Sequence, residues 1–303
     1  MIPGVEEMVK IEVIEERDDH LKVILKDTDR ALVNALRRTM MSNVPKMAIH
    51  KVRFELGTVT DNQTGETYES VGALPDEVIA HRLAMIPIPT FHDEFCFLED
   101  DPANEGLPRE EWGSPVSQII YHCSARGTAE GRTVTAGDLN VLGEDKLQIP
   151  ETYHDIPITK LFTGQYIEFY AYAVLGCGGD HAKWNPVSGV SFNARRIATI
   201  ARPQKAKALW DLDLTITSKD FKNKKLEDVL KVETLVREMH HVGAGTARID
   251  DFADAINLDD VPGEYLFSFD TDGSMTARTA FAEACKALNS RFVDLTSQLA
   301  DAL

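Results

Sequence analysis

The stretch DRALVNALRRTMMSNVP, from Asp29 to Pro45, decides the fold. Its spacing predicts a helix over residues 30–42, with apolar residues gathered on one side and polar or cationic residues on the other. Asp29 suits a helix start, Asn43 suits a left-handed C-terminal residue, and Pro45 prevents continuation. The apolar stripe contains Leu32, Val33, Ala35, Leu36 and Met40, and the second stripe contains Arg30, Asn34, Arg37 and Arg38. Spacing alone favours an ordinary core helix with solvated arginines near its negative end.

Length and charge narrow the class of protein. A chain of 303 residues suggests about two domains. Its composition, 43% apolar and 27% charged, is that of a protein with a real core. Its net charge of −17 argues against wrapping nucleic acid, because neutralising phosphates requires clustered Lys and Arg. One basic patch stands out from this acidic background, and it contains Arg195, Arg196, Arg202, Lys205 and Lys207.

Targeting segments and cysteine motifs are not evident in the sequence. No apolar run of about 20 residues predicts a membrane span, and the first residues do not resemble a signal peptide, so we expect a cytoplasmic protein. Cys96, Cys123, Cys177 and Cys285 are widely separated and show no CxxC spacing. We therefore expect reduced thiols and no cofactor, with neither zinc nor an iron–sulfur cluster.

Periodicity predicts the elements before residue 192. Two alternating runs, 10–16 and 21–25, predict a hairpin that leads into helix 30–42. Residues 46–56 predict a strand whose change of face marks a bulge. The polar residues 58–72 predict an exposed loop, and Pro75 suits the first position of a short helix that ends before Pro87. Three further β segments are predicted at 117–123, 132–136 and 165–175, the last with both faces covered.

The remaining chain predicts a strand at 211–217, a helix at 226–240 and a strand at 264–270. A long helix follows from about Thr276. Its apolar seam comprises Phe281, Ala284, Leu288, Phe292, Leu295 and Leu299. So continuous a stripe must lie against something, either this chain's own core or the equivalent helix of a partner.

The sequence specifies no catalytic site. HExxH, GxSxG, Walker and zinc-ligand spacings are all missing, and the glycines of 176–179 do not follow a phosphate-loop pattern. A metal-dependent hydrolase would have to draw on scattered histidines with nearby acids. Those histidines are His81, His181, His240 and His241.

Four separated strings resemble one known family. They are NALRRTMMSNVPKMAI at 34–49, DEVIAHRLAMIPI at 76–88 with Ala84 as the main substitution, HAKWNP at 181–186, and a strand, an acidic Gly-Ser turn and a long helix at the end. In this order they resemble the RNA polymerase assembly-platform family, which comprises bacterial alpha, the D polypeptide of archaeal RNA polymerase and the third-largest subunit of eukaryotic RNA polymerase II. The HAKWNP string is typical of the archaeal and eukaryotic branches.

The resemblance implies an α+β fold. Its dimerisation domain is expected from both chain ends, residues 1–50 and 263–303, with a β-rich domain inserted at 51–192. Residues 193–262 would be a third segment, for which some archaeal members suggest a degenerate ferredoxin-like domain. That stretch contains no cysteine, and only Cys96 stands where eukaryotic members bind zinc, so both metal sites of relatives are expected to be absent.

The resemblance also implies partners. The chain would be a non-catalytic transcription subunit that heterodimerises with small subunit L and docks small subunits N and P and the second-largest catalytic subunit. The interface with L, or the core beneath it, is expected at Leu32, Leu36, Met40, Phe281, Leu288 and Leu295. The second-largest subunit is expected at Asn34, Arg37 and Arg38. A docking loop is expected at His181, Lys183, Trp184, Asn185 and Pro186. A stand-alone homodimeric scaffold remains the alternative, with the hydrolase a less favoured one.

Overall fold

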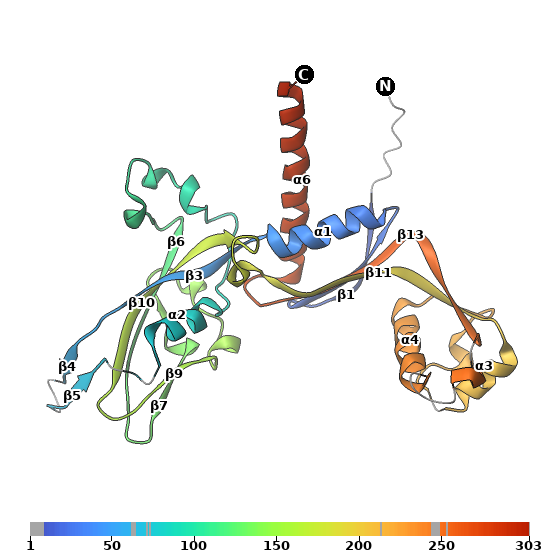
Figure 1. Ribbon diagram of the computed structural model, residues 1–303, viewed down its shortest axis with the longest axis horizontal. Helices are drawn as coiled ribbons and strands as arrows, with labels where there is room; N and C mark the ends of the chain where they lie inside the picture. The colour runs from blue at the N-terminus through green and yellow to red at the C-terminus, as the bar shows by residue number, and fades with distance from the viewer. Residues whose placement is uncertain are drawn as a thin grey trace. The chain divides into compact units, whose positions relative to one another are not determined.

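A computed structural model of the chain describes residues 9–61, 65–70, 72, 74–212, 214–243, 249–252 and 254–302 (Figure 1). Helices and antiparallel sheets both contribute, which confirms the predicted α+β class. Backbone contacts divide the chain into two compact units. The first unit takes its described residues from 1–14, 22–34 and 191–268, and the second from 15–21, 35–190 and 269–303. The predicted domain boundaries remain predictions.

A five-stranded sheet has the order β1-β2-β13-β11-β12. Its strands are β1 (Lys10–Glu16), β2 (His20–Lys26), β11 (Val187–Ile200), β12 (Lys225–Leu226) and β13 (Ile256–Thr271). β1 and β2 are sheet neighbours, which confirms the predicted hairpin, and Leu21, Val23 and Leu25 are buried as their alternation requires. The predicted strand at 264–270 is the end of the longer β13.

The first unit also contains α3 (Pro203–Trp210), α4 (Val229–Gly243) and α5 (Ile249–Phe252), whose apolar side chains share a core with Leu226 and Ile256. The helix predicted at 226–240 is therefore present but begins later, at Val229. The strand predicted at 211–217 is wrong, since no strand occurs in its described residues. The backbone amides of Thr215 and Ile216 instead donate to the carboxylate of Glu238, 3.1 and 3.4 Å away.

The second unit has a four-stranded sheet of order β3-β10-β6-β8. Its strands are β3 (Pro45–Phe54), β6 (Gln118–Arg126), β8 (Asn140–Val141) and β10 (Tyr166–Cys177), and a separate ribbon pairs β7 (Arg132–Thr135) with β9 (Pro157–Leu161). Tyr172 of β10 pairs with Lys51, whereas the next residue, Ala173, pairs with Ile49. His50 is therefore the extra residue of a bulge, which confirms the bulge predicted from the change of face.

The apolar core of this sheet continues into α2 (Asp76–Ala84). Ile79 and Leu83 enter the core, and Arg82 donates to the carbonyl oxygen of Ile158 at 2.8 Å. Pro75 precedes the helix as its N-cap residue rather than occupying its first turn, because its extended ψ of 149° places it outside the helix. The loop predicted at 58–72 contains a short hairpin, β4 (Thr58–Thr60) paired with β5 (Thr67–Glu69). That prediction was wrong because polar, turn-forming residues conceal strands this short.

Two helices carry the predicted interface residues, α1 (Arg30–Ser42) and α6 (Ala277–Ala302). Asp29 caps α1 as predicted, because its Oδ1 accepts the backbone amide of Leu32 at 2.8 Å. Asn43 does not adopt the predicted left-handed conformation. Its amide still bonds to the Thr39 carbonyl at 2.8 Å, and the chain passes directly into β3. No helix in the described part of the chain is long and apolar enough to span a membrane.

Short 3-10 helices complete the described structure: η1 (Leu98–Asp100), η2 (Pro102–Asn104), η3 (Arg109–Glu111), η4 (Ala136–Asp138), η5 (Asp145–Leu147), η6 (Glu151–Tyr153), η7 (Ala182–Trp184) and η8 (Ser218–Asp220).

Candidate subunit interface

The apolar stripe of α1 divides into a buried part and an exposed part. Val33, Leu36 and Met40 recur every three or four residues and are buried within the chain. Leu32 keeps 37% of its surface exposed, as does Met41 in the last turn. Of the predicted interface residues on α1, Leu36 and Met40 therefore lie in the core, and Leu32 lies at the surface.

The polar stripe of α1 is accessible from outside. Asn34 and Arg37 are half-buried, and a guanidinium nitrogen of Arg37 lies 3.5 Å from the sulfur of Met41. Arg38 is exposed and makes no ion pair with any described residue. A cation in this state is available to a carboxylate of another chain.

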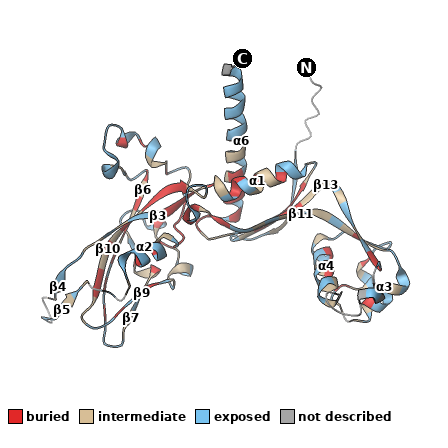
Figure 2. Cartoon of the chain, in the orientation of Figure 1, coloured by how far each residue is buried: buried red, intermediate tan, exposed pale blue. Residues whose placement is uncertain are grey.

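Helix α6 changes character along its length (Figure 2). Ala277, Ala280, Phe281 and Ala284 are buried, and the ring of Phe281 stacks on Phe269 with centroids 6.5 Å apart. Leu288 is half-buried, and every residue from 289 to 300 is exposed. The exposed end includes four large apolar side chains, Phe292 (54%), Val293 (58%), Leu295 (63%) and Leu299 (58%).

The predicted apolar seam of α6 therefore lies in two different environments. Its beginning, at Phe281 and Ala284, packs inside the chain, whereas its end has no cover among the described residues. Isolated apolar residues on a surface are ordinary, but a run of them along about three turns of one helix forms a patch. Such patches usually mark sites of protein association.

A buried ion pair joins segments that are distant in the sequence. Lys46, at the start of β3, is only 3% exposed, and its ammonium group contacts the carboxylate of Asp272 and donates to the carbonyl oxygen of Lys183 at 3.0 Å. Asp272 also accepts bonds from the amide and hydroxyl of Ser274, at 3.0 and 2.7 Å, and its own amide donates to Pro186. Three of the family-like strings therefore meet at this pair.

The HAKWNP loop is mainly an internal support. The ammonium group of Lys183 lies 3.2 Å from the Ile49 carbonyl oxygen and 3.0 Å from Nδ1 of His50, over the Trp184 ring. Burial lowers the pKa of Lys183 to about 8. Burial, followed by the charge of Lys183, also lowers the pKa of His50. Lys183, Trp184 and Pro186 are buried, Asn185 is half-buried and His181 is exposed, so a partner would reach the predicted docking loop at its His181 end.

The glycines at 176–179 permit close packing. A Cβ at Gly176 would overlap the Trp184 indole, and one at Gly178 would overlap the carbonyl oxygen of Met41. Gly179 donates its amide to the Ser42 carbonyl oxygen at 2.9 Å, which satisfies one of the free acceptors at the end of α1. Close approach to α1 and to Trp184 is thus sufficient to explain the glycines.

No group of three or more His, Cys, Asp or Glu residues in the described part of the chain is arranged to hold a metal. His81, His181, His240 and His241 are all exposed. Cys123 lies in the core of the second unit, where burial raises the pKa of its thiol to about 12. A thiol in this environment is a poor metal ligand or nucleophile, because both roles require the thiolate.

The contacts of Lys46, Asp272 and Gly178 are not identified by sequence reasoning. Lys46 and Asp272 each stand inside or beside a family-like string, but no local spacing pairs residues 226 positions apart. The observations define a class of protein, an α+β chain that leaves apolar helix surface available to another chain.

Comparison with known proteins names the family. The model of the RNA polymerase Rpb3/Rpb11 dimerisation domain matches residues 22–292, so the chain belongs to this family. It is similar to the DNA-directed RNA polymerase subunit Rpo3 of Thermococcus kodakarensis, with 30% identity over 97% of this chain and 100% of the relative. Rpo3 of Picrophilus torridus is 28% identical over 96% and 100%. The DNA-directed RNA polymerase II subunit rpb3 of Dictyostelium discoideum is 25% identical over 97% and 96%.

Proposed function

We propose that this chain is the non-catalytic assembly-platform subunit of a DNA-dependent RNA polymerase. In this role it pairs with small subunit L, docks small subunits N and P, and contacts the second-largest catalytic subunit. Three relatives that match this chain over 96% or more of their length are named as RNA polymerase subunits, which supports membership of such a complex. The proposal includes a cytoplasmic location, no bound cofactor and no direct contact with nucleic acid.

The uncovered end of α6 is the observation that carries the proposal. Phe292, Leu295 and Leu299 continue the spacing of the buried Phe281 and the half-buried Leu288 beyond the chain's own core. Full burial of a Leu or Phe side chain contributes about 1.5–3 kcal/mol, so a partner helix laid along this end would gain several such increments. Subunit L is the proposed partner, and the exposed Leu32 is assigned to the same interface.

The polar stripe of α1 is assigned to the second-largest subunit. Arg38 is exposed, and Asn34 and Arg37 are half-buried, so a partner carboxylate can form charge-assisted hydrogen bonds with this stripe. In the HAKWNP loop, the exposed His181 is the proposed point of contact. Lys183, Trp184 and Pro186 would act indirectly, by fixing the loop against β3 and β10.

Co-purification with matched variants tests the L interface. Tagged wild-type chain should retain an L-like small chain and the two large catalytic subunits. Leu295→Asp should weaken retention of the small chain by roughly 10–100-fold, because it removes an apolar contact and would bury a charge. Ser297→Asp adds the same charge to an exposed position on the opposite face of α6 and should retain the partner.

Two results would refute the assignment. Equal retention of the small chain by Leu295→Asp and Ser297→Asp would show that the α6 end is not the interface. Recovery of self-dimers alone would favour the homodimeric scaffold. Metal analysis of the same preparation separates the hydrolase alternative, which requires a tightly bound metal ion.

A further inference from the structure

Lys183 of the HAKWNP loop is a buried cation whose contacts are all with neutral groups. The residue is 9% exposed. Its ammonium group donates to the carbonyl oxygen of Ile49 at 3.2 Å and to Nδ1 of His50 at 3.0 Å, and it lies 4.3 Å from the centre of the Trp184 ring. It forms no ion pair with a described residue. Because removing a charge from water is costly, a buried ammonium group usually has a counter-charge.

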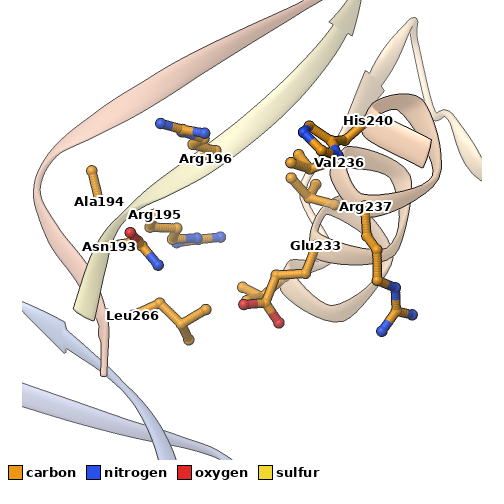
Figure 3. A pocket seen from close by; sticks show the side chains of 11 residues that line it. Asn193, Ala194, Arg195, Arg196, Glu233, Val236, Arg237, His240 and Leu266 are labelled. Carbon is orange, nitrogen blue, oxygen red and sulfur yellow. The ribbon is translucent and has the colours of Figure 1, made fainter. Parts of the chain in front are cut away.

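Other cations of this chain find their counter-charge within it. Lys46, the other buried lysine among the described residues, contacts the carboxylate of Asp272. In the cleft between β11 and α4 (Figure 3), the guanidinium of Arg195 lies 2.5 Å from the carboxylate of Glu264. Lys183 therefore differs from both, and the acid that would neutralise it is not supplied by the described part of the chain.

The charged and titratable groups around Lys183 come from three segments and leave it without a carboxylate. Burial lowers its pKa to about 8, and no acid offsets that effect. The segments are β3, with His50 and with Lys46 bound to Asp272; the loop itself, with Asp180 and His181, both exposed; and η3, with Arg109, which is bound to Glu99 at 3.3 Å.

His50 connects Lys183 to the surface. It is the extra residue of the β3 bulge and is exposed. An ammonium group can only donate, so Nδ1 of His50 accepts and Nε2 of this neutral ring carries the proton. That Nε2 has no hydrogen-bond partner among the described residues. The ring therefore presents an N–H donor to another molecule on one side and holds the buried cation on the other.

His181 provides a second donor of the same kind. The backbone amide of Lys183 donates to Nδ1 of His181 at 3.1 Å, so the exposed His181 ring also carries its proton on Nε2. Both imidazole rings lie against Trp184, with centroids 5.5 Å from it for His50 and 6.4 Å for His181. The accessible side of this aromatic cluster thus offers hydrogen-bond donors next to an uncompensated positive charge.

We propose that an aspartate or glutamate of another RNA polymerase subunit binds the Nε2–H of His50 and supplies, through this ring, the counter-charge that Lys183 lacks. The inference rests on the proposed function, in which this loop docks a subunit, and it adds the chemistry of that contact. A carboxylate fits because it is negative and only accepts hydrogen bonds. A nucleic-acid phosphate shares these properties, but the net charge of −17 disfavours it.

This contact makes docking sensitive to pH. A carboxylate beside His50 favours the charged form of Lys183, so the pKa of Lys183 rises on binding. The complex then holds a proton that the free chain has lost above about pH 8, and binding weakens as the pH rises. If the pKa returns from about 8 to the ordinary lysine value of about 10.4, affinity is about tenfold lower at pH 9 than at pH 7.

The test measures release of partner subunits from the tagged full-length chain. The chain is immobilised with the subunits that co-purify from its native cell, and each released subunit is quantified by mass spectrometry at pH 7 and at pH 9. We expect one subunit to leave about tenfold faster at pH 9, because differences in affinity appear mainly in dissociation rates. The L-like chain, assigned to α6, is the internal reference and should not show this acceleration.

Variants identify the groups responsible. His50→Ala, at an exposed position, should speed release by about tenfold at pH 7 and abolish the difference between the two pH values. Lys183→Met removes the titrating group and should also abolish that difference. His181→Asn keeps an acceptor for the Lys183 amide but lacks the distal N–H, so faster release would show donation to the partner and not support of the loop.

Lys51→Ala is the matched control, because it truncates the exposed side chain next to His50 and should leave both release rates within about twofold. Equal release from the wild-type chain at both pH values, or an unchanged pH difference in His50→Ala and Lys183→Met, would overturn this inference and leave the proposed function intact. Release by nuclease would also overturn it, by identifying a phosphate as the ligand. Retention of no large subunit at pH 7 would refute the proposed function and this inference with it.

Discussion

Removing the charge of Asp272 should destabilise the chain far more than removing the charge of its partner Lys46. The Lys46 side chain is 4% exposed, whereas Asp272 is 28% exposed and also accepts two bonds from Ser274. In Asp272→Asn the ammonium group stays buried with neutral acceptors only, the Lys183 carbonyl and the new amide oxygen. Breaking a buried pair in this way costs about 3–5 kcal/mol. We expect the lower end, because these neutral acceptors remain.

The reciprocal change leaves a better-solvated group behind. In Lys46→Met the carboxylate of Asp272 keeps its bonds to Ser274 and its access to water, so we expect a loss of roughly 1 kcal/mol. The predicted difference between the two variants is therefore about 2 kcal/mol, which lies well outside the error of a denaturation experiment. This asymmetry follows from exposure and not from the pair distance, which both variants share.

Urea unfolding followed by fluorescence and circular dichroism measures the difference. Trp184 reports locally, because the preceding residue supplies the carbonyl that Lys46 binds. Asp270→Asn is the matched control, since that carboxylate is 55% exposed and its bond to His20 should contribute less than about 1 kcal/mol. Equal losses in Asp272→Asn and Asp270→Asn, or a larger loss in Lys46→Met, would refute the reasoning.

Three further predictions concern Lys183, Gly178 and Leu36. The depressed pKa of Lys183, about 8, means that above this pH the folded chain releases a proton that the unfolded chain keeps. Its contribution to stability should therefore rise by roughly 1 kcal/mol between about pH 7 and 9, and Lys183→Met should lack this rise when both unfolding curves are compared. Gly178→Ala should cost about 1–3 kcal/mol because its Cβ overlaps a backbone carbonyl; unchanged stability would contradict the packing argument. Leu36→Ala should cost about 2–5 kcal/mol in the same denaturation assay, whereas Leu32→Ala should cost much less in the isolated chain.

Local patterns predicted much of the fold correctly. The bounds of α1, its Asp29 cap and the bulge at His50 all follow from spacing over a few residues, because each depends on interactions within one element or between adjacent strands. The strand predicted at 211–217 was wrong because the backbone there is fixed by a residue that is distant in the sequence. Its alternation is local, but the acceptor for its amides, Glu238, lies more than twenty residues away and directs the backbone out of a sheet.

The site was less accessible to sequence reasoning. Nothing in the order of residues pairs Lys46 with Asp272 or places Gly178 beneath Met41, because only the tertiary fold brings them together. Trp184 and Lys183 could be recognised as part of a distinctive string, yet the string does not reveal that their side chains face inward. The string therefore indicates an important segment, but it does not show which of its residues contact a partner and which only hold the loop in place.

In helix α6, burial distinguishes the residues that form the chain's own core from those that remain exposed. Apolar residues recur every three or four positions from Phe281 to Leu299. This recurrence predicts one apolar face, but it does not show whether each residue packs within its own chain or against another. Burial distinguishes them, since Phe281 is 9% exposed and Leu295 63%. Because the period continues past the point where the core of the described residues ends, we expect the remaining cover to come from another chain. The proposed division between the chain's own core and the partner interface thus lies near Leu288, which is half-buried.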